Sequence, residues 1–290
     1  MSATLPHDYL GELKELADGV SAFDSAEMVK IGEKYGKRLQ TLTHAYLCLR
    51  YLIERGDLNA SAPVGIRILY AKMVEGVGSI LLLLRHGLPG PAAQVFRSTL
   101  ETSIHLQVIL RDAEAIEERV RLFEEFLFIQ RRESHPGPGV TDEQRARNEE
   151  EFQRVKGNYH PVNRFSWAWK VCPSKRKRDG VPNNPNLKDL CIFIGHPEYH
   201  ETLYGPLSDT THPVPGYEMW LRGPDRNMYV GPKVSVHIPM LTRLTADFSM
   251  DTLLKMLDFL KPLDARALRI FYANVLLQAD PDAAQTATTP

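Results

Sequence analysis

Three polar side chains recur at intervals of four residues: Tyr204, Ser208 and His212. Positions i, i+4 and i+8 lie on one stripe of an α-helix, because four residues advance the helix by slightly more than one turn. An imidazole titrates near neutral pH and is suited to general acid–base work. The pattern predicts a binding or catalytic stripe with His212 as the proton-transfer group; a helix-end histidine bonded to backbone is the alternative.

A second polar stripe, Arg97, Glu101 and His105, repeats this spacing on a far more apolar segment. A charge buried there must be paired, since uncompensated desolvation is costly. One interpretation is a polar clamp between two helices. The other is catalytic: Arg97 binds an anion, and Glu101 orients it or moves a proton. The central hypothesis is that the two stripes meet in space, with Arg97, Glu101 and His212 as catalytic residues.

A basic run lies between the two stripes in sequence, close to a tryptophan. Cationic side chains there would contact phosphates while Trp167 stacks on a base. The alternative is a solvated basic loop. The predicted substrate-binding residues are therefore Tyr204, Ser208, Trp167, Lys175, Arg176, Lys177 and Arg178.

The chain has ten histidines, so a metal site must be considered. Glu101 and His105 are four residues apart, as are His196 and His200, but neither pair forms the His-Glu-x-x-His zinc motif. The repeated Glu-x-x-His of carboxylate-bridged bundles is also absent. No glycine-rich phosphate loop points to a nucleotide. We expect no metal and no other cofactor, with a carboxylate–histidine metal enzyme kept as an alternative.

Composition restricts the compartment and the partners. The net charge is −1, so no global positive field would collect nucleic acid. The three cysteines lack paired spacing, which fits a reducing compartment. The N-terminus has no signal-peptide pattern, and no apolar run approaches the roughly 20 residues of a membrane span. A cytoplasmic protein without a membrane segment is expected.

Helical periodicity predicts a mainly α, multi-helix bundle. N-terminal helices in residues 1–60 should pack as one unit with a core domain at 61–279, followed by a disordered tail at 280–290. The segment near 158–186 reads as a long irregular excursion, and the turn-rich stretch near 217–232 leaves room for a small hairpin. The segment 91–111 has a broad apolar face and should lie at the centre. Helices are expected over 8–18, 25–55, 62–86, 91–111, 114–134, 141–157, about 186–208, 236–260 and 264–278.

Three segments, Phe96–Glu101, Asn163–Trp169 and Tyr204–Pro213, together resemble a bacterial family of helical proteins, domain of unknown function 5677. The resemblance covers roughly residues 60–260. In outline the family is similar to the HEPN ribonucleases, helical proteins that often dimerise and act in toxin and phage-defence systems. The HEPN signature places Arg or Asn four to six residues before its His; this chain has Pro206, Leu207 and Ser208 in that interval before His212, and none of them is Arg or Asn.

The resemblance implies a homodimer that binds RNA and cleaves it without a metal ion. Arg97 would steady the scissile phosphate and His212 would transfer the proton of the ribose 2′-hydroxyl. The alternative from a different class is a non-enzymatic interaction or sensor protein. In that protein the same polar residues would form a structural hydrogen-bond network.

Overall fold

The computed structural model of the 290-residue chain describes residues 7–54, 57–134, 141–159, 165–172, 177–178, 181–182, 184–204, 237–261, 265–266 and 268–270. These residues form a mainly helical bundle, which confirms the predicted fold class. The long elements are α1 (His7–Glu54), α3 (Val64–Arg85), α4 (Pro89–Leu110), α5 (Ile116–Ser134), α6 (Asp142–Val155) and α10 (His237–Leu260). The short ones are α2 (Asp57–Ser61), α7 (Leu187–Ile194), the 3-10 turns η1 (Ala113–Ala115), η2 (Lys156–Asn158) and η3 (Ser166–Ala168), the π-helix η4 (Tyr199–Tyr204), and strands β1 (Lys177–Arg178) and β2 (Val181–Pro182).

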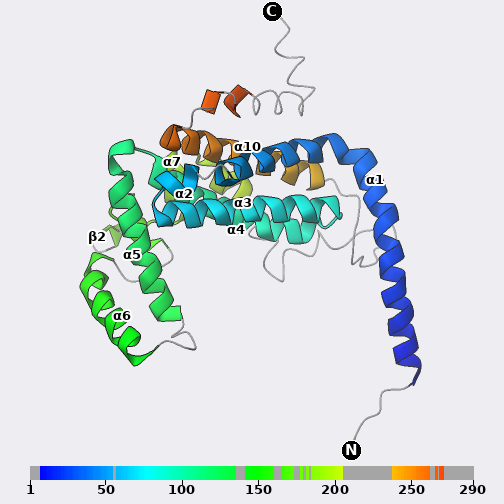
Figure 1. Cartoon of the computed structure of the whole chain (residues 1–290), viewed down its shortest axis with the longest axis horizontal. Helices are drawn as coiled ribbons and strands as arrows, with labels where there is room; N and C mark the ends of the chain where they lie inside the picture. Colours follow the sequence, from blue (N-terminus) through cyan, green and yellow to red (C-terminus); the bar gives the residue numbers. More distant parts are fainter. Residues whose placement is uncertain are drawn as a thin grey trace, which may run out of the picture.

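Helix α4 is the central element, as its broad apolar face predicts. It packs against α3, α5, α7 and α10, and every residue from 102 to 110 is buried. Figure 1 shows α3 and α4 lying along each other, with α10 and the C-terminal half of α1 above them. A helix buried on all sides cannot place charges there without partners. Any charged chemistry on α4 must therefore lie before residue 102.

The prediction of two helices before residue 55 is wrong, because α1 is a single helix. Two helices were expected, with Ser25 capping the second, but one helix of 48 residues runs through that position. No proline interrupts residues 7–54, and an internal glycine costs a helix only about 1 kcal/mol. The N-terminal half of α1 extends away from the bundle (Figure 1). The C-terminal half packs in the bundle and fully buries Ile31, Leu42 and Leu49.

Helices α3 and α4 are joined by a tight turn at Gly87. Its φ of 68° lies in the left-handed region that glycine adopts without strain. The amide of the next residue, Leu88, donates to the Leu83 carbonyl at 2.9 Å, so the last turn of α3 is closed. An apolar stripe through Ile68, Met73 and Ile80 was expected on α3. Met73 and Ile80 are fully buried, but Ile68 is 43% exposed, because a residue five positions before Met73 lies on another face of the helix.

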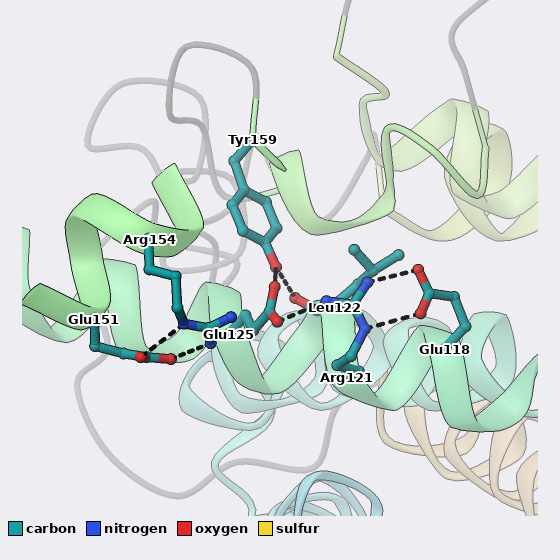
Figure 2. Close-up of polar contacts among 7 residues, drawn as sticks. All are labelled: Glu118, Arg121, Leu122, Glu125, Glu151, Arg154 and Tyr159. Carbon is teal, nitrogen blue, oxygen red and sulfur yellow. Dashed lines mark hydrogen bonds and ion pairs between the residues drawn. The ribbon is translucent and has the colours of Figure 1, made fainter. Parts of the chain in front are cut away.

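Helices α5 and α6 form an arm at one side of the bundle (Figure 1). Figure 2 shows Arg121 held between two carboxylates: it bonds Glu118 at 2.9 and 2.7 Å and Glu125 at 2.6 Å. Tyr159 follows α6 in the chain. Its hydroxyl shares its proton between Glu125, at 2.8 Å, and the Leu122 carbonyl, at 2.9 Å. These bonds anchor the segment after α6 on α5, and α6 itself is largely exposed, as its high density of charged residues predicts.

Two arginines fix α7 at the end of α4. The Arg111 guanidinium donates to the Phe193 carbonyl and stacks 4.2 Å from the centre of its ring. Arg119 is only 6% exposed; it pairs with Asp112 and donates to the Val108 carbonyl at 3.1 Å. The Arg119 guanidinium also lies 5.5 Å from the centre of the Phe193 ring, so both arginines contact α7.

The excursion near 158–186 is partly described. It contains η3 and a two-residue antiparallel ladder in which Lys177 lies opposite Pro182 and Arg178 opposite Val181. The predicted hairpin near 217–232 and the tail at 280–290 lie outside the described residues. Among the helices that the structure describes, none combines the length and apolarity needed to cross a bilayer.

Candidate functional site

The α4 stripe begins at the surface and ends in the core. Arg97 and Glu101 are both partly exposed, whereas His105, one turn further, is 9% exposed. The residue before Arg97, Phe96, is fully buried and packs edge-on against Phe248 of α10 with 5.4 Å between ring centres. Phe96 therefore brings the turn of α4 that carries Arg97 against α10, while Arg97 itself points about 100° away from Phe96 around the helix.

His105 sits in an aromatic box. The ring centres of Phe123, Phe165 and Trp167 lie 6.0, 5.7 and 5.5 Å from its own. The Trp167 indole N–H donates to His105 Nδ1 at 3.0 Å. Since Nδ1 accepts a hydrogen bond, the ring is neutral with its proton on Nε2 in this arrangement. His105 therefore packs as a core histidine, and no cluster able to hold a metal ion occurs among the described residues.

Trp167 departs from its predicted role. It is 0% exposed, so its ring offers no face on which a base could stack. Its neighbour Ser166 is equally buried and accepts a 3.2 Å hydrogen bond from Asn184. Burial assigns Trp167 to packing in the core. Sequence reasoning missed this because the partner, His105, lies 62 residues away in the chain.

The other predicted residues are placed only in part. Tyr204 is the last residue of the π-helix, where the backbone is described. Lys177 and Arg178 form β1. Four predicted residues lie outside the described part of the chain: Lys175, Arg176, Ser208 and His212. The meeting of the two polar stripes therefore stays a prediction.

A second polar cluster, which the sequence did not reveal, forms where α7 ends. Asn186 and Asp189 make a reciprocal capping box at the start of α7, and Gly195, at φ 88°, ends it in the left-handed conformation. The Gly195 turn is closed by the His196 amide, which donates to the Cys191 carbonyl at 2.9 Å. The His196 ring then lies near α10.

His196 lies between two carboxylates. Its Nδ1 is 2.8 Å from Glu198 Oε1, and its Nε2 is 3.9 Å from Asp251 Oδ2 on α10. Its ring stacks on Tyr199 with 4.7 Å between centres and 10° between planes, and the Tyr199 hydroxyl donates to Asp251. The sequence suggested His196 only as a metal ligand with His200. No sequence pattern around His196 indicates its contact with Asp251, because the two residues lie on different elements.

The electrostatics of this cluster favour positioning over phosphate chemistry. Burial, and then the hydrogen bond to Asp251, raise the pKa of Tyr199, so its phenol stays protonated at neutral pH. Burial alone would raise the pKa of Glu198, but hydrogen bonds from His196 and from the backbone outweigh it and leave that pKa lowered. The lowered pKa keeps Glu198 ionised at neutral pH, and its negative charge beside the imidazole would repel a phosphate.

The raised pKa of Tyr199 predicts alkaline destabilisation. An unfolded tyrosine ionises near pH 10, whereas the folded state keeps this phenol protonated. Its contribution to stability is therefore fully present below about pH 10 and is lost as the pH rises further. Urea unfolding under reducing conditions between about pH 8 and pH 11 should show a steeper fall for the wild type than for Tyr199→Phe. The exposed Tyr51 provides the control, and equal slopes for Tyr199→Phe and Tyr51→Phe would contradict the prediction.

The cysteines do not supply a nucleophile. All three are buried and unpaired. Burial raises the pKa of Cys48 and of Cys172 to about 11 and that of Cys191 to about 12. Thiols with such values are protonated at neutral pH, and the thiolate is the reactive form. These side chains belong to the core.

Comparison with known proteins gives one match. The model of a family described as "Family of unknown function (DUF5677)" matches residues 64–220, more than half of the chain. The match includes the α4 stripe, Trp167 and the residues from His196 to Tyr199, and it ends before α10. Neither the curated proteins nor the solved structures contain a match.

Proposed function

This chain belongs to the DUF5677 family, whose description assigns no activity, and we propose that it cleaves RNA without a metal ion. The proposed site combines Arg97 and Glu101 of α4 with His212. One observation carries the proposal: α10 contacts both α4 beside Arg97 and the start of the segment that leads to His212.

Two contacts of α10, made by Phe248 and Asp251, provide that observation. Phe248 packs on Phe96, the residue before Arg97. Three residues further along α10, Asp251 accepts the hydrogen bond of Tyr199, the first residue of the π-helix. The π-helix that leads towards His212 therefore begins beside the part of α10 that contacts Phe96. This proximity supports an approach of Ser208 and His212 to Arg97 and Glu101.

The proposed chemistry is transfer within the RNA backbone. His212 takes the proton of a ribose 2′-hydroxyl, whose oxygen attacks the adjacent phosphorus. The bond to the 5′-oxygen breaks, that oxygen takes a proton, and a 2′,3′-cyclic phosphate remains. Arg97, a permanent cation with a planar donor fork, binds the phosphate oxygens. Glu101 orients Arg97 or His212, and Tyr204 and Ser208 contact the phosphate.

The test is cleavage of a broad RNA panel by the full chain in excess chelator. His212→Ala and Arg97→Ala should each lower the rate by roughly 100-fold or more, the usual effect of removing an acid–base or phosphate-binding group. Arg145→Ala is the matched control, because Arg145 lies on exposed α6 with a loose 3.9 Å pairing to Asp142. Its rate should equal the wild-type rate.

Two results would contradict the proposal: intact RNA across the panel, or wild-type cleavage by His212→Ala. The unfolding free energies of the same variants distinguish RNA cleavage from the alternative, a non-enzymatic protein whose polar residues only fix helix packing. If Arg97 only fixes helix packing, Arg97→Ala should lose several kcal/mol of stability, as expected for a broken buried pair. A catalytic Arg97 predicts lost activity with near wild-type stability, because its side chain is partly exposed.

A further inference from the structure

The π-helix is the least regular element of the described chain. π-helices are rare, and they occur frequently at functional sites. This one spans Tyr199–Tyr204 and begins only a few residues after α7 ends at Ile194. A rare element of this kind depends on the contacts that surround it.

Two neighbouring helices hold this π-helix through side chains. Tyr199 is 5% exposed and donates its hydroxyl to Asp251 of α10. Glu201 forms a 2.8 Å ion pair with Lys188 of α7. Both side chains are well exposed, so this pair adds little to the stability of the π-helix. The Tyr199–Asp251 contact is therefore the stronger of the two.

His196 reinforces that contact from the other side. Its ring covers Tyr199 at 4.7 Å, and its two nitrogens face Glu198 and Asp251. The four side chains come from the turn after α7, from the π-helix and its approach, and from α10. Their exposed fractions show a cluster that is only partly open to solvent: 30% for His196, 53% for Glu198 and 32% for Asp251.

We propose that His196, Glu198, Tyr199 and Asp251 form a latch that fixes the start of the π-helix on α10 and so positions Tyr204 and the residues after it. The catalytic consequence rests on the proposed function: the latch sets the approach of His212 to Arg97. These four are positioning residues. Asp251 serves two partners at once, because it accepts from Tyr199 and faces His196 Nε2.

Amide hydrogen exchange of residues 199–204 tests the latch directly. Tyr199→Phe keeps the stack on His196 but removes the hydroxyl, and exchange there should accelerate roughly tenfold, as expected from the loss of a hydrogen bond to a charged group. Asp251→Asn keeps an acceptor for Tyr199 but removes the charge, so its effect should be smaller. In the double variant the two effects should be less than additive, because both substitutions break one contact.

Two control variants distinguish loss of the latch from a general loss of protein stability. Tyr51→Phe removes a hydroxyl from an exposed tyrosine, and Asp258→Asn neutralises an exposed carboxylate two turns further along α10. Neither should change exchange at 199–204. Unchanged exchange in Tyr199→Phe, or additive effects in the double variant, would overturn the latch.

The RNA assay then distinguishes the latch from the function. If the wild type cleaves RNA, Tyr199→Phe should lower kcat about tenfold with little change in KM, since it misplaces His212 and leaves Arg97 intact. His212→Ala should lower cleavage by roughly 100-fold or more without faster exchange at 199–204. If the wild type does not cleave RNA, the proposed function fails, and the exchange experiment still decides the latch.

Discussion

Replacing Gly76 by alanine should destabilise the protein by about 3 kcal/mol, the upper part of the usual range for overpacking. A Cβ atom at this position of α3 would lie 2.1 Å from Thr99 Oγ1 and 3.0 Å from Thr99 Cβ. Thr99 has little freedom to move, because it is β-branched and buried and its hydroxyl donates to the Val95 carbonyl at 2.8 Å. The two central helices would have to separate.

The matched control is the same substitution where space is open. A Cβ at Gly32 of α1 meets nothing within 4 Å, so Gly32→Ala should be neutral or stabilise by up to about 1 kcal/mol through helix propensity. Urea denaturation of both variants measures the difference. Similar stability for the two would show that the α3–α4 contact relaxes more easily than its geometry indicates.

Replacing Trp167 by alanine should cost about 3–5 kcal/mol, the range for emptying a large aromatic site in a core. The ring is 0% exposed and packs edge-on against Phe123 with 5.3 Å between centres. The substitution would also remove the donor to His105 Nδ1. Trp167→Phe keeps most of the volume and loses that bond, so it should cost about 1–3 kcal/mol.

Trp169→Phe is the control for Trp167→Phe, because Trp169 belongs to the same segment but is partly exposed. It should be the milder change in chemical denaturation. The comparison also bears on nucleic-acid binding. If Trp167 stacked on a base, Trp167→Phe would weaken RNA binding at unchanged stability, and that result would contradict its assignment to the core.

The sequence by itself determined the class of fold and most of its helices. The broad apolar face at 91–111 correctly placed α4 at the centre, and the charge density at 141–157 correctly predicted the exposed α6. Such patterns are local: residues three and four apart share a helix face, so a stripe of apolar side chains reveals which face is buried. The same rule recognised the Arg97–Glu101 stripe.

Other features were decided by tertiary contacts. The Trp167–His105 bond joins residues 62 apart, and the Tyr199–Asp251 bond joins residues 52 apart. Periodicity reports only neighbours along one helix. Which polar groups meet across helices depends on how the apolar faces pack, and only the folded chain decides that.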